Sequence, residues 1–470
     1  MRTNTVHWAI SEVVLVLTVL LISPSAYGQV LTESAKWLPL DGAMEDFFGW
    51  SVSVSADVAV VGAPFDDDNG TNAGSVYVIR RNPGAPGSWM PEQKLVSSDG
   101  VPEDKFGHWV SVSGDVAVVG ASLRDDNGNA SGAAYVFRYH PELPLGSRWV
   151  EEQKLLASDG APVDGFGSYL SVSGDVAVLG APGDDDIGVS GGSAYVFRFD
   201  ATETVCGQKW CQEQKLLASD WVEDLQFGSS VSISGGVAVV GAIHDDDNGS
   251  HSGSAYVFRW NGSSWVMEQK LLASDGATFD KFGGRVSVAN DVAVVAAFED
   301  DDKGTDSGST YVFRYHPELL LGSRWVEEAK LLASDGAAGD TFGNYVSVSG
   351  YVAVVSAPYH DDNGSNSGSA YVFRWNGSSW VEEQKLLASD GAADDQFGVS
   401  ASVSGDVVVL GADYDDDNGS FSGSAYVFDL AAPIPAVSTW GIIVLLLLLT
   451  TAGTIVLARD RALTGSGVSR

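Results

Sequence analysis

The chain has 470 residues, enough to bury a large core, and its 62 acidic against 26 basic side chains give a formal net charge of −36. A surface with this charge repels phosphate backbones, which excludes nucleic acid as a partner and favours cations and basic partners. The chain is also long enough for one large repeat domain but leaves little room for a second domain beside it.

Residues 1–28 have the layout of a secretory signal peptide. Arg2 supplies the positive start, Val13–Ile22 forms a short apolar segment, and Ala26 and Gly28 are the small residues expected before a cleavage site. The mature chain is therefore predicted to begin at Gln29 and to be exported.

An internal repeat that begins at a Phe-Gly pair fills residues 29–430. Its seven copies start at Phe48, Phe106, Phe166, Phe227, Phe282, Phe342 and Phe397. Each copy contains an alternating SVS segment, a Val-rich run ending in Gly-Ala, an acidic loop, a strand such as SAYVF and a charged segment such as WVEEQKLL. Because only strand-like segments recur, the sequence predicts an all-β, seven-bladed β-propeller with four strands in each blade.

The two ends of the repeat region are incomplete in a complementary way. The segment Lys36–Leu40 resembles a fourth strand but precedes the first copy, whereas the last copy stops at Tyr426–Leu430 without a fourth strand. We expect the N-terminal strand to pair with Tyr426–Leu430 and to close the ring, since closure removes exposed sheet edges.

An acidic loop joins the second and third strands of every copy. Its aspartates are Asp66, Asp67, Asp68, Asp125, Asp126, Asp184, Asp185, Asp186, Asp245, Asp246, Asp247, Asp300, Asp301, Asp302, Asp361, Asp362, Asp415, Asp416 and Asp417. Hard oxygen ligands beside a glycine turn are what calcium needs, but aspartates ahead of a glycine also form Asx-turns, and both interpretations stay open. The parity of the strands places these loops on one face with the Asp-x-Phe-Gly aspartates, such as Asp46 and Asp395.

Two cysteines, Cys206 and Cys211, flank a short loop between a third and a fourth strand. Export places them in an oxidising compartment, so the sequence predicts a disulfide, with a pair of free thiols as the alternative. Cross-strand positions at such a hairpin lie within reach of a disulfide.

The end of the chain is predicted to anchor the protein in a membrane. Residues 431–441 form a linker, 442–458 an apolar helix just long enough to span a bilayer, and 459–470 a short cytoplasmic tail. Arg459 and Arg461 favour this orientation, and Trp440 lies where an interfacial aromatic side chain belongs.

Two resemblances add to these observations. Phe-Gly, then Gly62-Ala63-Pro64, then a strand ending in Tyr-Val-Phe resemble the FG-GAP repeat of integrin α-subunit propellers and their bacterial relatives. This resemblance implies a propeller used for adhesion or recognition, often with bound calcium. The integrin calcium loop, D-x-D-x-D-G, lies between the first two strands, where this chain has only Ser-Gly-Asp, so those ligands do not carry over.

The tail resembles the IPTL-type C-terminal sorting signal of exported bacterial proteins, through Ile434, Pro435, Trp440 and Gly441. Ala436, Val437 and Thr439 depart from the usual residues of that signal. The resemblance supports an anchored protein at the cell surface.

We expect a non-enzymatic cell-surface propeller that binds an extracellular protein or glycan, with calcium as its candidate cofactor and the membrane as its anchor. Catalysis is not predicted, because the carboxylates recur around the ring and form no single distinct centre. Two alternatives are a structural envelope or matrix component without a specific ligand, and a hydrolase or lyase built on a propeller.

Overall fold

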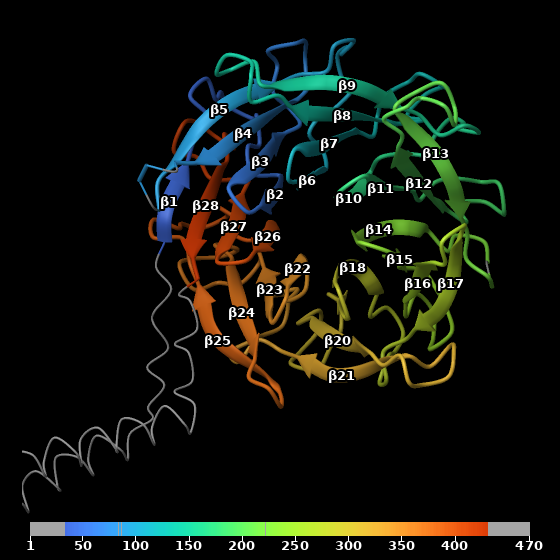
Figure 1. Ribbon diagram of the computed structural model, residues 1–470. Helices are drawn as coiled ribbons and strands as arrows, with labels where there is room; N and C mark the ends of the chain where they lie inside the picture. Colours follow the sequence, from blue (N-terminus) through green and yellow to red (C-terminus); the bar gives the residue numbers. More distant parts are fainter. Residues whose placement is uncertain (1–32, 83, 86, 221, 431–470) are drawn as a thin grey trace, which may run out of the picture. The chain divides into compact units, whose positions relative to one another are not determined.

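The computed structural model describes residues 33–82, 84–85, 87–220 and 222–430. Within them, strands form seven four-stranded antiparallel sheets, which stand as blades around a central axis (Figure 1). The predicted all-β, seven-bladed propeller is confirmed. The predicted signal peptide (1–28), the linker with its sorting residues (431–441), the membrane helix (442–458) and the tail (459–470) lie outside the described residues. No helix in the described part of the chain is long and apolar enough to cross a membrane.

Each blade runs outward from the axis in chain order. The innermost strands are β2 (Ser51–Ser55), β6 (Val110–Ser113), β10 (Tyr169–Ser173), β14 (Phe227–Ser234), β18 (Phe282–Ala289), β22 (Val346–Ser349) and β26 (Ser400–Ser404). The second strands are β3 (Val58–Ala63), β7 (Val116–Ala121), β11 (Val176–Ala181), β15 (Val237–Ala242), β19 (Val292–Ala297), β23 (Val352–Ala357) and β27 (Val407–Ala412).

The third strands are β4 (Ser75–Arg81), β8 (Ala133–Tyr139), β12 (Ser193–Phe199), β16 (Ser254–Trp260), β20 (Ser309–Tyr315), β24 (Ser369–Trp375) and β28 (Ser424–Asp429). The outermost strands are β5 (Trp89–Leu95), β9 (Trp149–Leu155), β13 (Trp210–Leu216), β17 (Trp265–Leu271), β21 (Trp325–Leu331), β25 (Trp380–Leu386) and β1 (Glu33–Trp37). The blades that begin at β2, β6, β10, β14, β18, β22 and β26 are called blades 1 to 7 below.

The hydrophobic core lies between neighbouring blades. Every residue of β7 (VAVVGA) is buried, because each face of this second strand packs against an adjacent sheet. Val58 and Val60 of blade 1, for example, share a cluster with Val110 and Val112 of blade 2. The Val-rich runs that are apolar on both faces are explained by this sandwiched position.

The serines of the innermost strands form a belt around the axis. In every blade a strand N–H donates to the hydroxyl of a serine in the preceding blade at 3.0–3.1 Å. The accepting serines are Ser53, Ser111, Ser171, Ser232, Ser287, Ser347 and Ser402. The alternating SVS pattern thus turns valine to the core and serine to the next blade.

The N-terminal strand closes the ring. β1 pairs antiparallel with β28, with Lys36 opposite Tyr426 and Trp37 opposite Ala425, so it is the outermost strand of blade 7. The pairing of the two ends is confirmed, although the strand spans Glu33–Trp37 and not the predicted Lys36–Leu40. Pro39 has no N–H to donate, and a turn begins there with Gly42 N–H donating to its carbonyl.

The connection between β12 and β13 contains a disulfide between Cys206 and Cys211, whose Cα atoms are 5.9 Å apart. The described residues contain no free cysteine. The disulfide therefore closes the hairpin loop of blade 3 on the face opposite the acidic loops.

The closing contact gives a first prediction. Trp37 is buried against Trp89 of blade 1, with ring centroids 5.4 Å apart. Trp37→Ala should therefore lower the free energy of unfolding by about 3 kcal/mol. The nearby Leu40→Ala should change it by less than about 0.5 kcal/mol, since Leu40 is 91% exposed. Denaturant unfolding of the full chain measures both, and equal curves for Trp37→Ala and the wild type would contradict this account of closure.

Candidate functional site

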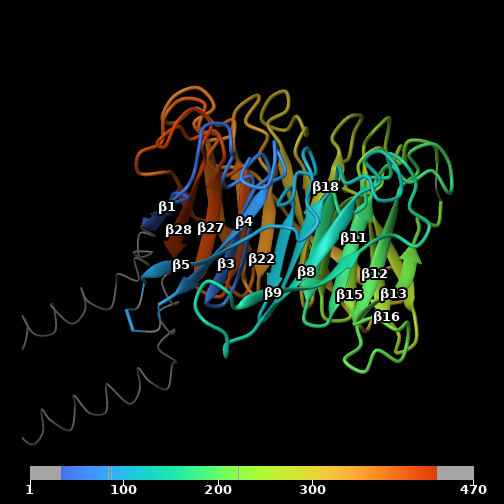
Figure 2. The same cartoon turned by 90° about the horizontal axis from the view of Figure 1, so that it is seen from above.

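The acidic loops between second and third strands lie beside the loops that enter the next blade. Phe106 N–H donates to the Ala73 carbonyl at 2.9 Å, and Phe47 N–H donates to the Phe421 carbonyl at 3.0 Å across the closing seam. Loops project from both faces of the ring (Figure 2), and these two sets share one of them, as expected. We call it the acidic face.

A lysine side chain lies at the centre of each group of aspartates on this face. In blade 3 the ammonium of Lys215 contacts Asp184 at 2.8 Å, Asp186 at 2.6 Å and Asp159 at 2.9 Å. The Tyr195 hydroxyl donates to Asp159 and Asp184 beside it. One cation with three carboxylates and a tyrosine is called a lysine cluster below.

Five blades contain the full cluster, and blades 2 and 6 contain a variant in which the lysine contacts two carboxylates. The lysines are Lys94, Lys154, Lys215, Lys270, Lys330, Lys385 and Lys36, in blades 1 to 7. Two blades differ at the first aspartate of the loop. Arg124 takes that position in blade 2 and contacts Asp99, Asp104 and Asp126, whereas blade 6 has His360, a ring nitrogen of which lies 3.3 Å from Lys385 Nζ.

The three aspartates of a loop have separate tasks, as blade 3 shows. Asp184 is buried; one of its oxygens accepts the Asp186 N–H in an Asx-turn, and the other contacts Ser193, Tyr195 and Lys215. Asp185 turns away and accepts the Ser190 N–H. The predicted candidates therefore divide into lysine ligands at the first and third positions and a turn-forming aspartate between them.

The same division holds around the ring. The lysine contacts use Asp66, Asp68, Asp126, Asp184, Asp186, Asp245, Asp247, Asp300, Asp302, Asp362, Asp415 and Asp417. The loop N–H contacts use Asp67, Asp125, Asp185, Asp246, Asp301 and Asp361. Asp416 accepts the Gly419 N–H through its backbone carbonyl.

A further carboxylate of each cluster comes from the segment after the outermost strand, which is Ser-Asp-Gly in five copies: Asp41, Asp99, Asp159, Asp220, Asp275, Asp335 and Asp390. The Asp-x-Phe-Gly aspartates, which we expected to converge with the loops, lie beside the clusters and cap a backbone N–H. Asp46, for example, accepts the Ala43 N–H at 2.6 Å. Burial and the nearby Asp66 carboxylate raise the pKa of Asp46 to about 6.

The titration behaviour of a cluster follows from these contacts. Burial alone would lower the pKa of Lys215, but hydrogen bonds to Asp184, Asp186 and Asp159 raise it well above its usual range. Burial raises the pKa of Asp184, yet the Lys215 and Tyr195 hydrogen bonds outweigh it and the net shift is downward. The cluster is therefore an ion pair at neutral pH.

Sequence reasoning missed the lysines, although they recur in every copy at the Lys of the QKL-type segment. A search for basic residues with the same period as the aspartates could have found them, because the two sets alternate once in each copy.

The outermost strands of neighbouring blades are joined by a repeated contact that we call the Trp–Glu link. Trp149 Nε1 donates to Glu92 at 3.1 Å, and Gln93 exchanges two hydrogen bonds of 2.8 Å with the Trp149 backbone. The same indole contact joins four later pairs of blades, through Trp210, Trp265, Trp325 and Trp380.

The closing seam between β1 and β5 lacks this link. Ser34 stands where the other outermost strands have Glu, Ala35 stands where all of them except β21 have Gln, and within the described residues the indole N–H groups of Trp37 and Trp89 are buried without a partner. Pro91 also replaces the residue that, as Glu151 in blade 2, bonds to Ser98 of the preceding blade.

A groove of about 550 Å³ lies at this seam. It is lined by Lys36, Trp37, Leu38, Pro39, Leu40, Asp41, Phe48, Tyr77, Val78, Ile79, Trp89, Pro91, Glu92, Gln93 and Lys94. Its volume is within the usual range of ligand sites, and its lining combines aromatic and apolar surface with a few polar groups, as such sites do. This seam groove is therefore the best-formed candidate for a binding site.

The match to a family of repeats agrees with the fold. Seven segments match the profile described as FG-GAP repeat, at residues 31–79, 89–137, 149–197, 210–258, 265–313, 325–373 and 380–428. No curated protein matches the sequence. Among solved structures, the crystal structure of Saccharomyces cerevisiae Sqt1 is similar with a TM-score of 0.44 and 8% identity, over 83% of this chain and 98% of that chain.

Removing one cluster cation gives a second prediction. Lys215→Met leaves the buried Asp184 without its ammonium partner, so we expect a loss of about 2–3 kcal/mol of stability at pH 7. This loss is smaller than for a fully buried pair, because the other two carboxylates are partly exposed. Lys209→Met removes one ion pair of a lysine that is 45% exposed, and its partner Glu152 keeps its contacts with Arg138 and Trp210, so this variant should cost less than about 1 kcal/mol. Denaturant unfolding compares them, and equal losses would contradict a structural role for the cluster.

A third prediction concerns Asp413, which occupies the proline position of Gly-Ala-Pro in blade 7. It is buried, its Oδ1 has no hydrogen-bond partner, and burial raises its pKa to about 7. Between pH 4 and pH 7 the folded protein keeps the Asp413 carboxyl protonated, whereas the unfolded chain releases this proton. The free energy of unfolding should therefore fall as the pH rises from about 4 to about 7.

Asp413→Asn should therefore stabilise the protein by about 3 kcal/mol at pH 7 and by little at pH 4. Unfolding curves of both proteins across this pH range test the difference. A stability difference that stays constant with pH would contradict the raised pKa.

Proposed function

Since the chain belongs to the FG-GAP repeat family, we propose that it is a non-enzymatic binding protein of the cell surface that recognises an extracellular protein or glycan. Its predicted signal peptide and the predicted helix at 442–458 support export and attachment to a membrane. The propeller is then the part of the chain that faces the ligand.

The observation that carries this proposal is the seam groove. Tyr77, Trp89 and Pro91 contribute aromatic and apolar lining, and the indole N–H groups of Trp37 and Trp89 have no hydrogen-bond partner within the described residues. Sugars and peptide segments both need this combination of stacking surface and polar partners. The five Trp–Glu links join blades 1 to 6, whereas the seam between blades 7 and 1, where the groove lies, lacks such a link.

Two observations favour binding over catalysis. The lysine clusters of blades 1, 3, 4, 5 and 7 share one arrangement of a lysine and three carboxylates, so these clusters do not form a single distinct centre of acid and base groups. The axial channel is small, with a volume of about 100 Å³ and a lining of serines, Trp109, Tyr345 and Arg285. A substrate of ordinary size needs about 300 Å³ or more.

Calcium dependence is the finer part of this proposal. Lysine ammonium groups already lie 2.5–3.0 Å from the carboxylates of blades 1, 3, 4, 5 and 7. A calcium ion at the same oxygens would have to displace the lysine. Calcium-dependent binding would therefore require rearranged clusters or oxygen atoms outside them.

The test is binding of the purified full-length chain to glycan and protein arrays. The informative variant is Pro91→Glu, which restores the glutamate found in blade 2 as Glu151 and should fill the groove while keeping or raising stability. We expect it to weaken binding to any ligand found by at least about tenfold, as loss of a central contact does. Leu320→Ala, on an exposed insertion between β20 and β21, is the control and should leave binding unchanged.

Repeating the assay in chelator, in calcium and in magnesium at matched ionic strength tests the calcium part. A ligand that binds Pro91→Glu as well as the wild type would overturn the groove as the site. Absence of any ligand would favour the structural alternative, an envelope or matrix component.

A further inference from the structure

Blade 4 differs from its neighbours on the acidic face. Leu225, fully buried, occupies the position that the other copies give to the aspartate of Asp-x-Phe-Gly, such as Asp164 and Asp280. The carboxylate stands one residue earlier, as Asp224, and its side chain is 55% exposed. It is therefore free of the capping contact that holds the equivalent aspartates.

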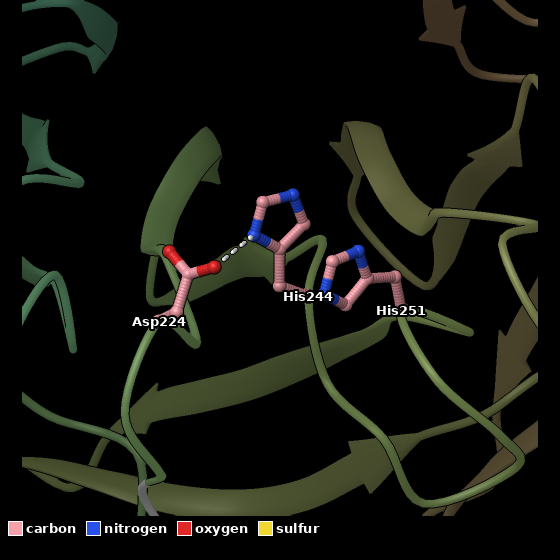
Figure 3. Close-up of side chains that lie close together, drawn as sticks. All are labelled: Asp224, His244 and His251. Carbon is pink, nitrogen blue, oxygen red and sulfur yellow. Dashed lines mark hydrogen bonds and ion pairs between the residues drawn. The ribbon is translucent and has the colours of Figure 1, made fainter.

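Two histidines of the same blade lie beside this carboxylate. His244 and His251 come from the loop between β15 and β16, and Asp224 from the loop between β13 and β14. His244 Nδ1 is 3.2 Å from Asp224 Oδ2, and the two imidazole rings are stacked with centroids 4.2 Å apart and planes 13° from parallel. Figure 3 shows the carboxylate and both rings in one group. One ligand atom from each residue lies within 4.8 Å of the others.

This group differs from the lysine clusters because it contains no internal cation. In the described part of the chain, Asp224 has no ion pair with a lysine or an arginine; its side-chain contacts are the His244 ring and the Gln226 amide. Two other groups of potential ligands, Asp220–Asp245–Asp247 and Asp335–His360–Asp362, have a lysine among them, Lys270 and Lys385. The histidine group is thus the one of the three whose centre is open to a metal ion.

We propose that Asp224, His244 and His251 bind a divalent transition metal, with Zn²⁺ as its representative. Two imidazoles and one carboxylate suit zinc, whereas calcium takes oxygen ligands. The proposal is therefore independent of calcium and of the seam groove.

The distances are compatible with zinc coordination. Zinc bonds to histidine nitrogen and carboxylate oxygen of about 2.0–2.2 Å place tetrahedral ligand atoms about 3.3 Å apart. His244 Nδ1 and Asp224 Oδ2 already have about that separation. A His251 ring nitrogen lies within 4.8 Å of both ligand atoms. Rotation of this partly buried side chain out of the stacked arrangement would bring the nitrogen to a bonding distance from the metal.

The metal would join loops of three consecutive blades. Asp224 N–H donates to the Val189 carbonyl of blade 3, and the His251 carbonyl accepts the Lys281 N–H of the loop that enters blade 5. Three protein ligands leave a fourth position for water or for a donor atom of a bound molecule.

The experiment is a titration of the metal-free full-length chain with zinc, read by calorimetry and by competition with a fluorescent zinc chelator. We expect one saturable site. His244→Gln, His251→Asn and Asp224→Asn should each lower the zinc affinity by at least about tenfold, because even the loss of a residue that only hydrogen-bonds to a metal ligand lowers metal affinity by that factor. Asparagine already stands at the His251 position in blades 1 and 6, as Asn72 and Asn366, so that variant should fold normally.

The matched control is His316→Gln. His316 lies on the opposite face in the insertion between β20 and β21, where it contacts Glu318 at 3.0 Å, and its loss should leave zinc affinity unchanged. Anomalous diffraction at the zinc edge should place the ion within about 2.0–2.2 Å of the three ligand atoms. Absence of saturable zinc binding, or full affinity in His251→Asn, would overturn the proposal.

Discussion

Every blade depends on one close approach of two backbones. The Phe-Gly pair that starts a blade lies against the glycine that precedes the third strand of the blade before it. Gly74 adopts a φ of +83°, and a Cβ there would lie 2.1 Å from the Phe106 carbonyl oxygen. Phe106 is then fully buried against Tyr135 and Phe137 of its own blade. Because this contact sets the distance between adjacent blades, it also brings each acidic loop beside the segment that enters the next blade, which is where the lysine clusters form.

The clusters explain how so acidic a chain keeps a compact ring. Carboxylates at these separations repel one another, and the repulsion grows where water is excluded. A lysine of the outermost strand supplies the opposite charge from within the same blade, and a tyrosine hydroxyl donates a further hydrogen bond. The acidic face remains negative, since each ammonium is shared by three carboxylates in most blades. The carboxylates of the clusters are nevertheless fixed by hydrogen bonds and ion pairs.

The number of blades, the order of strands and closure by the N-terminal strand were predictable, because each leaves a periodic or complementary trace in the sequence. β1 was expected at Lys36–Leu40 but spans Glu33–Trp37. Pro39 prevents the strand from continuing, and the segment resembles the other outermost strands only in its Lys36. The lysines were missed because their partners come from two different loops, so no short motif contains the cluster. Asp224, His244 and His251 stand at loop positions where the residue differs from copy to copy, and only the fold shows that the three meet at one point. The seam groove likewise follows from Ser34, which stands where other outermost strands have the glutamate of the Trp–Glu link, and this difference has meaning only once β1 is seen beside β5.

The antiparallel pairing of β1 with β28 has a mechanical consequence. Glu33, at the start of β1, lies opposite Phe428, near the end of β28, so the two ends of the folded ring leave from the same edge of one blade. A force that pulls these ends apart would open their hydrogen bonds one after another. A force applied at the C-terminal end and resisted by a ligand on the ring would instead load the bonds of β28 to both β1 and β27 together. Blade 7 would carry the tension, and the seam between β1 and β5 would be the first contact with another blade to which the force is transmitted.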